Sequence, residues 1–183
     1  MRLALRIAAL IDRLTERIGL AVSWLSLAMI LVGAYNTIVR YSGRFLGWNL
    51  SSNLYLELQW YLFSLVFLLG AAYTLRQNAH VRVDVLYDRF SPRTKAWVNL
   101  VGSLVFLIPF CVFGLIVSWP AVASSWAIRE ASSDPGGLPR YPIKTVILVA
   151  FALLILQAIS EVIHRIAFLK AYETERSRGA LQV

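Results

Sequence analysis

Four long apolar stretches, separated by shorter polar segments, dominate the pattern of residues along the chain. Their predicted limits are residues 18–39, 54–75, 97–119 and 142–163. A hydrocarbon core of about 30 Å is crossed by roughly 20 apolar residues in a helix that rises about 1.5 Å per residue, so these stretches can span it. Lys144 and Glu161 lie near the ends of the fourth stretch, where long side chains reach water. The pattern predicts an all-α integral membrane protein with four transmembrane helices.

The third stretch contains a proline and has clear signals at both ends. Pro109 lies in its middle and would kink the helix unless neighbouring helices absorb the distortion. Apolar residues continue beyond Pro120 to Trp126, so we expect the helix to extend that far. Ser91 and Pro92 have the N-cap and first-turn positions of a helix start.

Two amphipathic segments accompany the predicted spans. Residues 1–17 lead into the first span with an apolar stripe opposite their charges, formed by Leu3, Ile7, Leu10, Ile11, Leu14 and Ile18. This segment fits either a helix lying on the membrane or a cytoplasmic extension of the first span. A second apolar face consists of Val83, Leu86, Tyr87 and Phe90. It predicts a short helix at the cytoplasmic interface between spans two and three.

Basic residues are concentrated in alternate polar segments. The chain has 183 residues, of which 58% are hydrophobic and 15% charged, and its net charge is +8. Most of its 18 Lys and Arg residues lie before the first span (Arg2, Arg6, Arg13, Arg17), between the second and third (Arg76, Arg82, Arg89, Arg93, Lys95) and after the fourth (Arg165, Lys170, Arg176, Arg178). Because such residues flank spans on the cytoplasmic side, both termini are expected in the cytoplasm.

This topology also accounts for the basic charge, which in a soluble protein would suggest nucleic acid. We therefore expect the lipid bilayer, and no nucleic acid, as a partner. The predicted organisation is an interfacial segment (1–17), a membrane domain (18–164) and a cytoplasmic tail (165–183).

Residues suited to catalysis or cofactor binding are few. A transmembrane haem needs imidazoles on facing helices, but the two histidines, His80 and His164, lie in charged sequence at predicted cytoplasmic ends. A single cysteine, Cys111, excludes an internal disulfide and a two-cysteine redox or zinc site. Asp84 and Asp88, one helical turn apart beside arginines, are typical of a solvated face. We predict no enzyme activity and no catalytic, cofactor-binding or metal-binding residue.

Polar and small residues recur on one face of several predicted spans. These are Ser26, Gly33 and Thr37 on the first, Glu57, Tyr61, Ser64, Ala71 and Ala72 on the second, and Gln157, Ser160, Glu161 and His164 on the fourth. Polar groups are costly in lipid and tend to face protein or water, and small residues let helices approach closely. Two explanations remain open: these faces pack the four helices together, or they also bind a larger membrane partner.

The order of several motifs resembles a known transporter family. Glu57 lies early in the second span and Gly70 near its end, residues 77–84 (QNAHVRVD) follow, and Pro92 opens the next helix. The H-V-x-V-D pattern within that run is the most specific part. With the chain length, the four spans and the expected cytoplasmic termini, these motifs resemble the small permease (DctQ-like) subunit of tripartite ATP-independent periplasmic (TRAP) transporters.

The resemblance implies a secondary transporter of the bacterial inner membrane. In this family a periplasmic substrate-binding protein captures an organic anion, and a large membrane subunit moves it in a sodium-coupled cycle. The small subunit is expected to be a scaffold for both partners, so no substrate or ion site is carried over. The residues expected to face the large subunit are Ser26, Gly33, Glu57, Tyr61 and Ser64. His80 and Asp84, one helical turn apart, are expected to be structural.

The predicted periplasmic loop at residues 130–142 is rich in proline and glycine. Arg129 and Arg140 are expected to dock the binding protein there, although they could instead meet only lipid headgroups. The rival function is a haem or quinone membrane-anchor subunit of a redox enzyme. A self-contained small exporter normally needs a charged residue deep in the membrane. Glu57 lies only three residues inside its predicted span, so this function is disfavoured.

Overall fold

The computed structural model describes residues 2–47, 52–79, 87 and 89–180. Its helices are α1 (Arg2–Leu46), α2 (Asn53–Arg76), α4 (Pro92–Val101), the π-helix η1 (Gly102–Leu107), α5 (Ile108–Ala127) and α6 (Arg140–Ala180). Within these described residues, four helical runs are long and apolar enough to cross a membrane, and α4, η1 and α5 together form one of them. The predicted all-α membrane fold with four spans is confirmed, and the chain is a multi-pass membrane protein.

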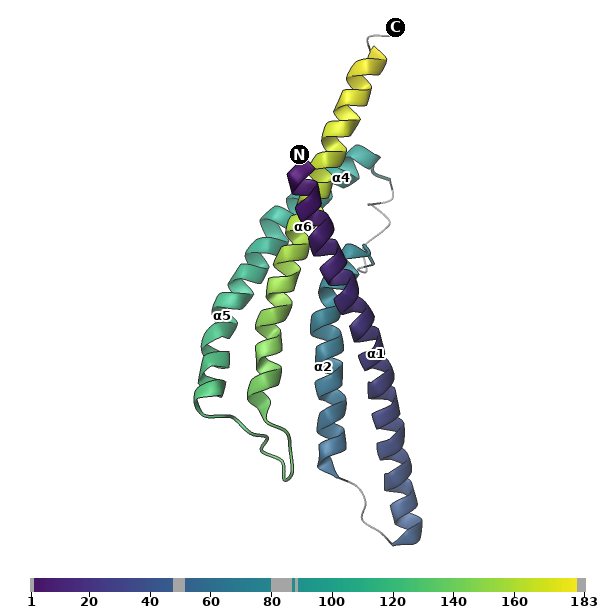
Figure 1. Ribbon diagram of the computed structural model, residues 1–183, viewed down its shortest axis with the longest axis vertical. Coiled ribbons are helices and arrows are strands. Elements are labelled where there is room, and N and C mark those ends of the chain that lie inside the picture. The colour runs from purple at the N-terminus through teal and green to yellow at the C-terminus, as the bar shows by residue number, and fades with distance from the viewer. Residues whose placement is uncertain (1, 48–51, 80–86, 88, 181–183) are drawn as a thin grey trace.

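The other three runs are arranged around α6. It packs against α1, α2, α4 and α5, and α1 packs against α2. The start of α1 and the end of α6 lie at one end of the bundle, whereas the end of α1, the start of α2 and the α5–α6 connection lie at the opposite end (Figure 1). Two of the contacts between helices depend on a glycine opposite an aromatic ring: a Cβ at Gly114 would lie 2.5 Å from the Phe151 ring, and one at Gly19 would lie 2.4 Å from the Tyr73 ring.

Residues 2–46 form one continuous helix, so the amphipathic N-terminal segment runs directly into the first span. Its small residues Ala8 and Thr15 are buried, whereas Leu3 and Leu10 of the apolar stripe are exposed. The face that carries these small residues is therefore turned toward the other helices. Its position relative to a membrane surface stays a prediction.

The third run begins as predicted. The Ser91 hydroxyl accepts a hydrogen bond from the Thr94 N–H at 3.2 Å, and Pro92 occupies the first turn. The helix also continues through Pro120 to Ala127. The irregularity linked to Pro109 takes the form of a π-helix in the preceding turn, where the Ile108 N–H bonds to the Ser103 carbonyl. A π-turn widens the backbone where a proline ring would otherwise clash with the carbonyl four residues earlier.

The connection between α2 and α4 is described only in part. His80, Asp84 and most of the predicted interfacial helix lie outside the described residues. Tyr87 is described, and its hydroxyl accepts a hydrogen bond from the Asn99 side chain of α4 at 3.0 Å. The interfacial helix and the structural role of His80 and Asp84 stay predictions.

Candidate functional site

The loop between α5 and α6, residues 128–139, is attached to the first turns of α2 through Glu57. This carboxylate accepts hydrogen bonds from the Ser132 hydroxyl and the Leu138 N–H. Glu57 is only 2% exposed although it lies in a candidate membrane span. Two donors from the loop therefore satisfy an acidic group that would be costly to leave unpaired in lipid.

Neighbouring side chains reinforce this attachment. The Tyr61 hydroxyl, one turn after Glu57, donates to the Pro139 carbonyl at 2.7 Å. The Arg140 guanidinium donates to the Ser132 hydroxyl oxygen at 3.4 Å and lies 5.9 Å from the Trp60 ring centroid. These contacts hold the end of the loop over α2.

The start of the loop is attached to α5 and α6 through Glu130. Its carboxylate forms an ion pair with Lys144 and accepts a 2.7 Å hydrogen bond from the Ser125 hydroxyl. The hydrogen bond from Lys144 and then the one from Ser125 lower the pKa of Glu130 from its ordinary value of 4.5. The Arg140 N–H also donates to the Glu130 carbonyl at 2.8 Å. Both ends of the loop are thus bound to the helices.

Arg129 occupies an unusual backbone conformation at the end of α5. The Arg129 N–H bonds to the Trp126 carbonyl at 3.2 Å, and the Glu130 N–H bonds to the Ser125 carbonyl at 3.0 Å. These two bonds form a Schellman motif, in which the Arg129 position normally carries glycine. Arg129 has a φ of 48°, a left-handed conformation that costs a residue other than glycine about 1–2 kcal/mol.

The Arg129 side chain is exposed. It forms no hydrogen bond or ion pair with the part of the chain that the structure describes. The loop therefore presents a cation at a rigid position, with no partner of its own among those residues.

A second polar cluster joins α1 to α6 near the opposite end of the bundle. Asp12 accepts hydrogen bonds from the Ser160 hydroxyl at 2.7 Å and from the Gln157 amide at 3.0 Å. The His164 Nδ1 lies 3.8 Å from the other Asp12 oxygen. Gln157 and Ser160 are almost fully buried. The cluster is therefore an internal link between helices.

Ion pairs connect further elements near this end. Glu16 of α1 pairs with Arg76 of α2 at 3.2 Å. Arg93 of α4 pairs with Glu173 of α6 at 3.3 Å. Both pairs are partly exposed, so each contributes at most about 1 kcal/mol.

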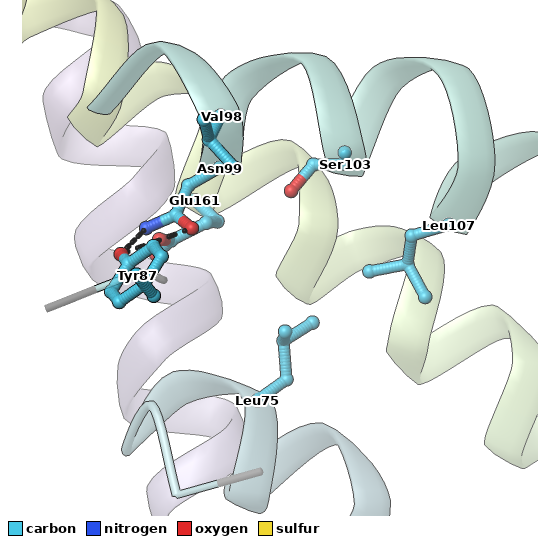
Figure 2. Close-up of a pocket in the computed structure, with 8 residues that line it drawn as sticks. Leu75, Tyr87, Val98, Asn99, Ser103, Leu107 and Glu161 are labelled. Carbon is cyan, nitrogen blue, oxygen red and sulfur yellow. Dashed lines mark hydrogen bonds between the residues drawn. The ribbon is translucent and has the colours of Figure 1, made fainter. Parts of the chain in front are cut away.

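A cavity of about 410 Å³ lies between the end of α2 and the α4–η1 segment. Figure 2 shows the Ser103 hydroxyl, Glu161 and the hydrogen-bonded pair Tyr87 and Asn99 on its wall. Leu75, Val98 and Leu107 make other parts of it apolar. Among the described residues, no group of three or more His, Cys, Asp and Glu side chains could hold a metal ion.

The structure places the expected interface residues in different surroundings. Glu57 and Tyr61 each form a hydrogen bond with the α5–α6 loop. The hydroxyls of Ser26 and Ser64 bond to carbonyls of their own helices, Val22 at 3.3 Å and Trp60 at 2.7 Å. Gly33 packs against the side chain of Gln59. Contact of these residues with a large subunit stays a prediction.

Sequence reasoning missed two polar residues in the bundle, Asp12 and Gln59. Asp12 lies between Ala8 and Thr15 at helical spacing, on the small-residue face of the first helix. That spacing could have predicted that Asp12 faces the other helices. Gln59 has no comparable signal, because its role depends on Gly33 in another helix.

One of the comparisons with known proteins gives a match. Residues 29–168 match the family model described as tripartite ATP-independent periplasmic transporters, DctQ component. No curated protein and no solved structure gives a significant match. The family is a transporter component and not an enzyme, and nothing favours the redox-anchor alternative. Since the match covers more than half of the 183 residues, the chain belongs to the DctQ component family of the TRAP transporters, as their small membrane subunit.

Proposed function

We propose that this subunit is a scaffold for sodium-coupled uptake of an organic acid across the bacterial inner membrane. It binds the large TRAP subunit within the bilayer, with both of its own termini in the cytoplasm. Its α5–α6 loop faces the periplasm and helps to dock the substrate-binding protein. Substrate and sodium are bound by the other subunits.

The observation that carries the docking role is the combination of a fixed loop and a strained arginine. Glu57 and Glu130 attach the two ends of the loop to three helices. A preorganised surface loses little conformational entropy when a partner binds. Arg129 is exposed there at a backbone position that favours glycine, so the side chain is retained at a cost to stability.

Arg140 has a different role in this proposal. Its guanidinium contacts Ser132 and lies near Trp60, and the residue is only partly exposed. Arg140 therefore shapes the loop, with its remaining exposed surface available to the binding protein. Arg129 offers the more specific test, because its side chain can be changed without removing a described contact.

The test is uptake by the complete complex in proteoliposomes as the concentration of binding protein is varied. Arg129→Glu should raise the half-saturating concentration of binding protein by about fivefold, the equivalent of roughly 1 kcal/mol for an exposed charge pair. Uptake at saturating binding protein should change little. High salt should reduce the difference between the variant and the wild type, because it screens exposed charges.

Arg129→Gly is the matched control for folding. Glycine suits the left-handed position, so this variant should keep the loop or stabilise it while losing the charge. We expect it to weaken docking less than Arg129→Glu but measurably. Wild-type dependence on binding protein in both variants would refute the docking role of Arg129.

A further inference from the structure

A groove runs between α1 and α2 in the half of the bundle nearest the α5–α6 loop. It has a volume of about 570 Å³, and its lining includes Ile30, Gly33, Ala34, Gln59, Trp60 and Phe63. Several of these side chains are exposed within the isolated subunit, among them Ile30 at 62% and Phe63 at 55%. Both walls belong to candidate membrane spans, so any occupant of the groove would be a component of the membrane.

In this groove the amide side chain of Gln59 packs against Gly33. A Cβ at Gly33 would lie 2.3 Å from Gln59 Nε2, so the absence of a side chain there makes room for the amide. Gln59 lies six residues inside α2, about 9 Å from its first residue at 1.5 Å per residue. That depth is within one half of a hydrocarbon core of about 30 Å.

The Gln59 amide has no hydrogen-bond partner among the residues that the structure describes. Acyl chains supply neither donors nor acceptors, and an unsatisfied amide in hydrocarbon is costly. The groove therefore favours an occupant that can form hydrogen bonds at this depth.

We propose that the groove receives a transmembrane helix of the large TRAP subunit and that Gln59 hydrogen-bonds to a polar group on it. The inference rests on the proposed scaffold function and specifies where the large subunit binds. Glu57 and Tyr61 lie on the same helix, but their described hydrogen bonds go to the α5–α6 loop. Gln59 instead offers donor and acceptor atoms to a partner, and Gly33 leaves room for the Gln59 amide in the groove.

The exposed face of α5 differs from the groove in composition. Phe106 of η1 and Phe110, Phe113 and Ile116 of α5 are all more than 60% exposed. None of these side chains carries a polar group, so acyl chains can solvate this face without loss of hydrogen bonds. It provides a control surface on the same subunit.

The test is photo-crosslinking in the assembled complex. A photoreactive amino acid is placed at Ala34, at Phe63 and, as a control, at Ile116, and the products are identified by mass spectrometry. The groove positions should crosslink to the large subunit, whereas Ile116 should crosslink to lipid. Crosslinks from Ala34 and Phe63 to lipid alone, or to the large subunit only from Ile116, would overturn the groove assignment.

A substitution separates this inference from the scaffold function on which it rests. Gln59→Leu should lower the recovery of large subunit with the tagged chain by about threefold, as expected for loss of one hydrogen bond between membrane helices. Ile116→Leu should leave recovery unchanged. Full recovery with Gln59→Leu would overturn the role of Gln59 alone. If the wild-type chain recovers no large subunit, the proposed function and this inference fail together.

Discussion

Ser132 and Glu57 are 75 residues apart in the sequence, yet the Ser132 hydroxyl donates directly to the Glu57 carboxylate. The same carboxylate accepts the Leu138 N–H, so one side chain of α2 binds two points of the α5–α6 loop. Gly137, which precedes Leu138, has no room for a side chain, since a Cβ there would lie 2.7 Å from Glu57 Oε1. The loop is therefore closely fitted to a single acidic residue.

Removal of that acidic group should release the loop without preventing membrane insertion. Glu57→Leu leaves the Leu138 N–H and the Ser132 hydroxyl without their acceptor, at a cost of about 1–3 kcal/mol. We expect amide hydrogen exchange at Leu138 to accelerate roughly tenfold or more, since 1.4 kcal/mol corresponds to a factor of ten.

Glu57→Gln is the matched control for this experiment. Its carbonyl oxygen can accept one of the two hydrogen bonds, so exchange at Leu138 should fall between the wild type and Glu57→Leu. Unchanged exchange in Glu57→Leu would show that other contacts hold the loop.

Acidification should loosen the loop through Glu130. Its pKa is lowered in the folded protein, so the ionised form is favoured by folding. This contribution is fully present above the ordinary pKa of 4.5 and is lost as the pH falls through the lower folded value. We expect hydrogen exchange at the Arg140 N–H, corrected for its intrinsic pH dependence, to accelerate below pH 4.5 in the wild type.

The control variant removes only the titration. Glu130→Gln should loosen the loop at neutral pH and should show a smaller further change on acidification. If the variant and the wild type respond equally to acid, the pH dependence arises from another group and not from Glu130.

The link between α1 and α6 should depend on Asp12. Asp12→Leu removes the acceptor of the Gln157 amide and leaves the Ser160 hydroxyl with its longer hydrogen bond, 3.3 Å, to the Ala8 carbonyl. Because Gln157 and Ser160 are almost fully buried, the substitution should lower the free energy of unfolding by about 1–3 kcal/mol. Thermal melting of the purified subunit in detergent measures this change. Glu16→Gln, one turn away, removes an exposed ion pair with Arg76 and should cost less than about 1 kcal/mol. Equal effects of the two substitutions would argue against a special role for the Asp12 cluster.

The elements that sequence predicted well depend on local or one-dimensional properties. The four spans follow from the length of apolar sequence that a bilayer requires. The helix start at Ser91 and Pro92 follows from the chemistry of unsatisfied N–H groups in the first turn. Such properties are encoded within a few neighbouring residues, so they can be predicted without a structure.

The parts that sequence left open depend on contacts between distant segments. The alternation of charges and apolar residues does not reveal that Glu57 meets Ser132, or that Gln59 lies on Gly33. The π-helix is a further example, because Pro109 predicts a distortion but not which backbone geometry relieves it. These features are set by helix packing, which brings together residues from different turns and different helices.

The central claim, that this chain is a scaffold with no transport activity of its own, is tested most directly by reconstitution. The measurement is sodium-dependent uptake of the organic acid carried by the cognate binding protein, in liposomes that contain the small subunit, the large subunit or both. We predict uptake when both subunits and the binding protein are present, and none with the small subunit alone. Sodium-dependent uptake by the isolated small subunit would contradict the claim.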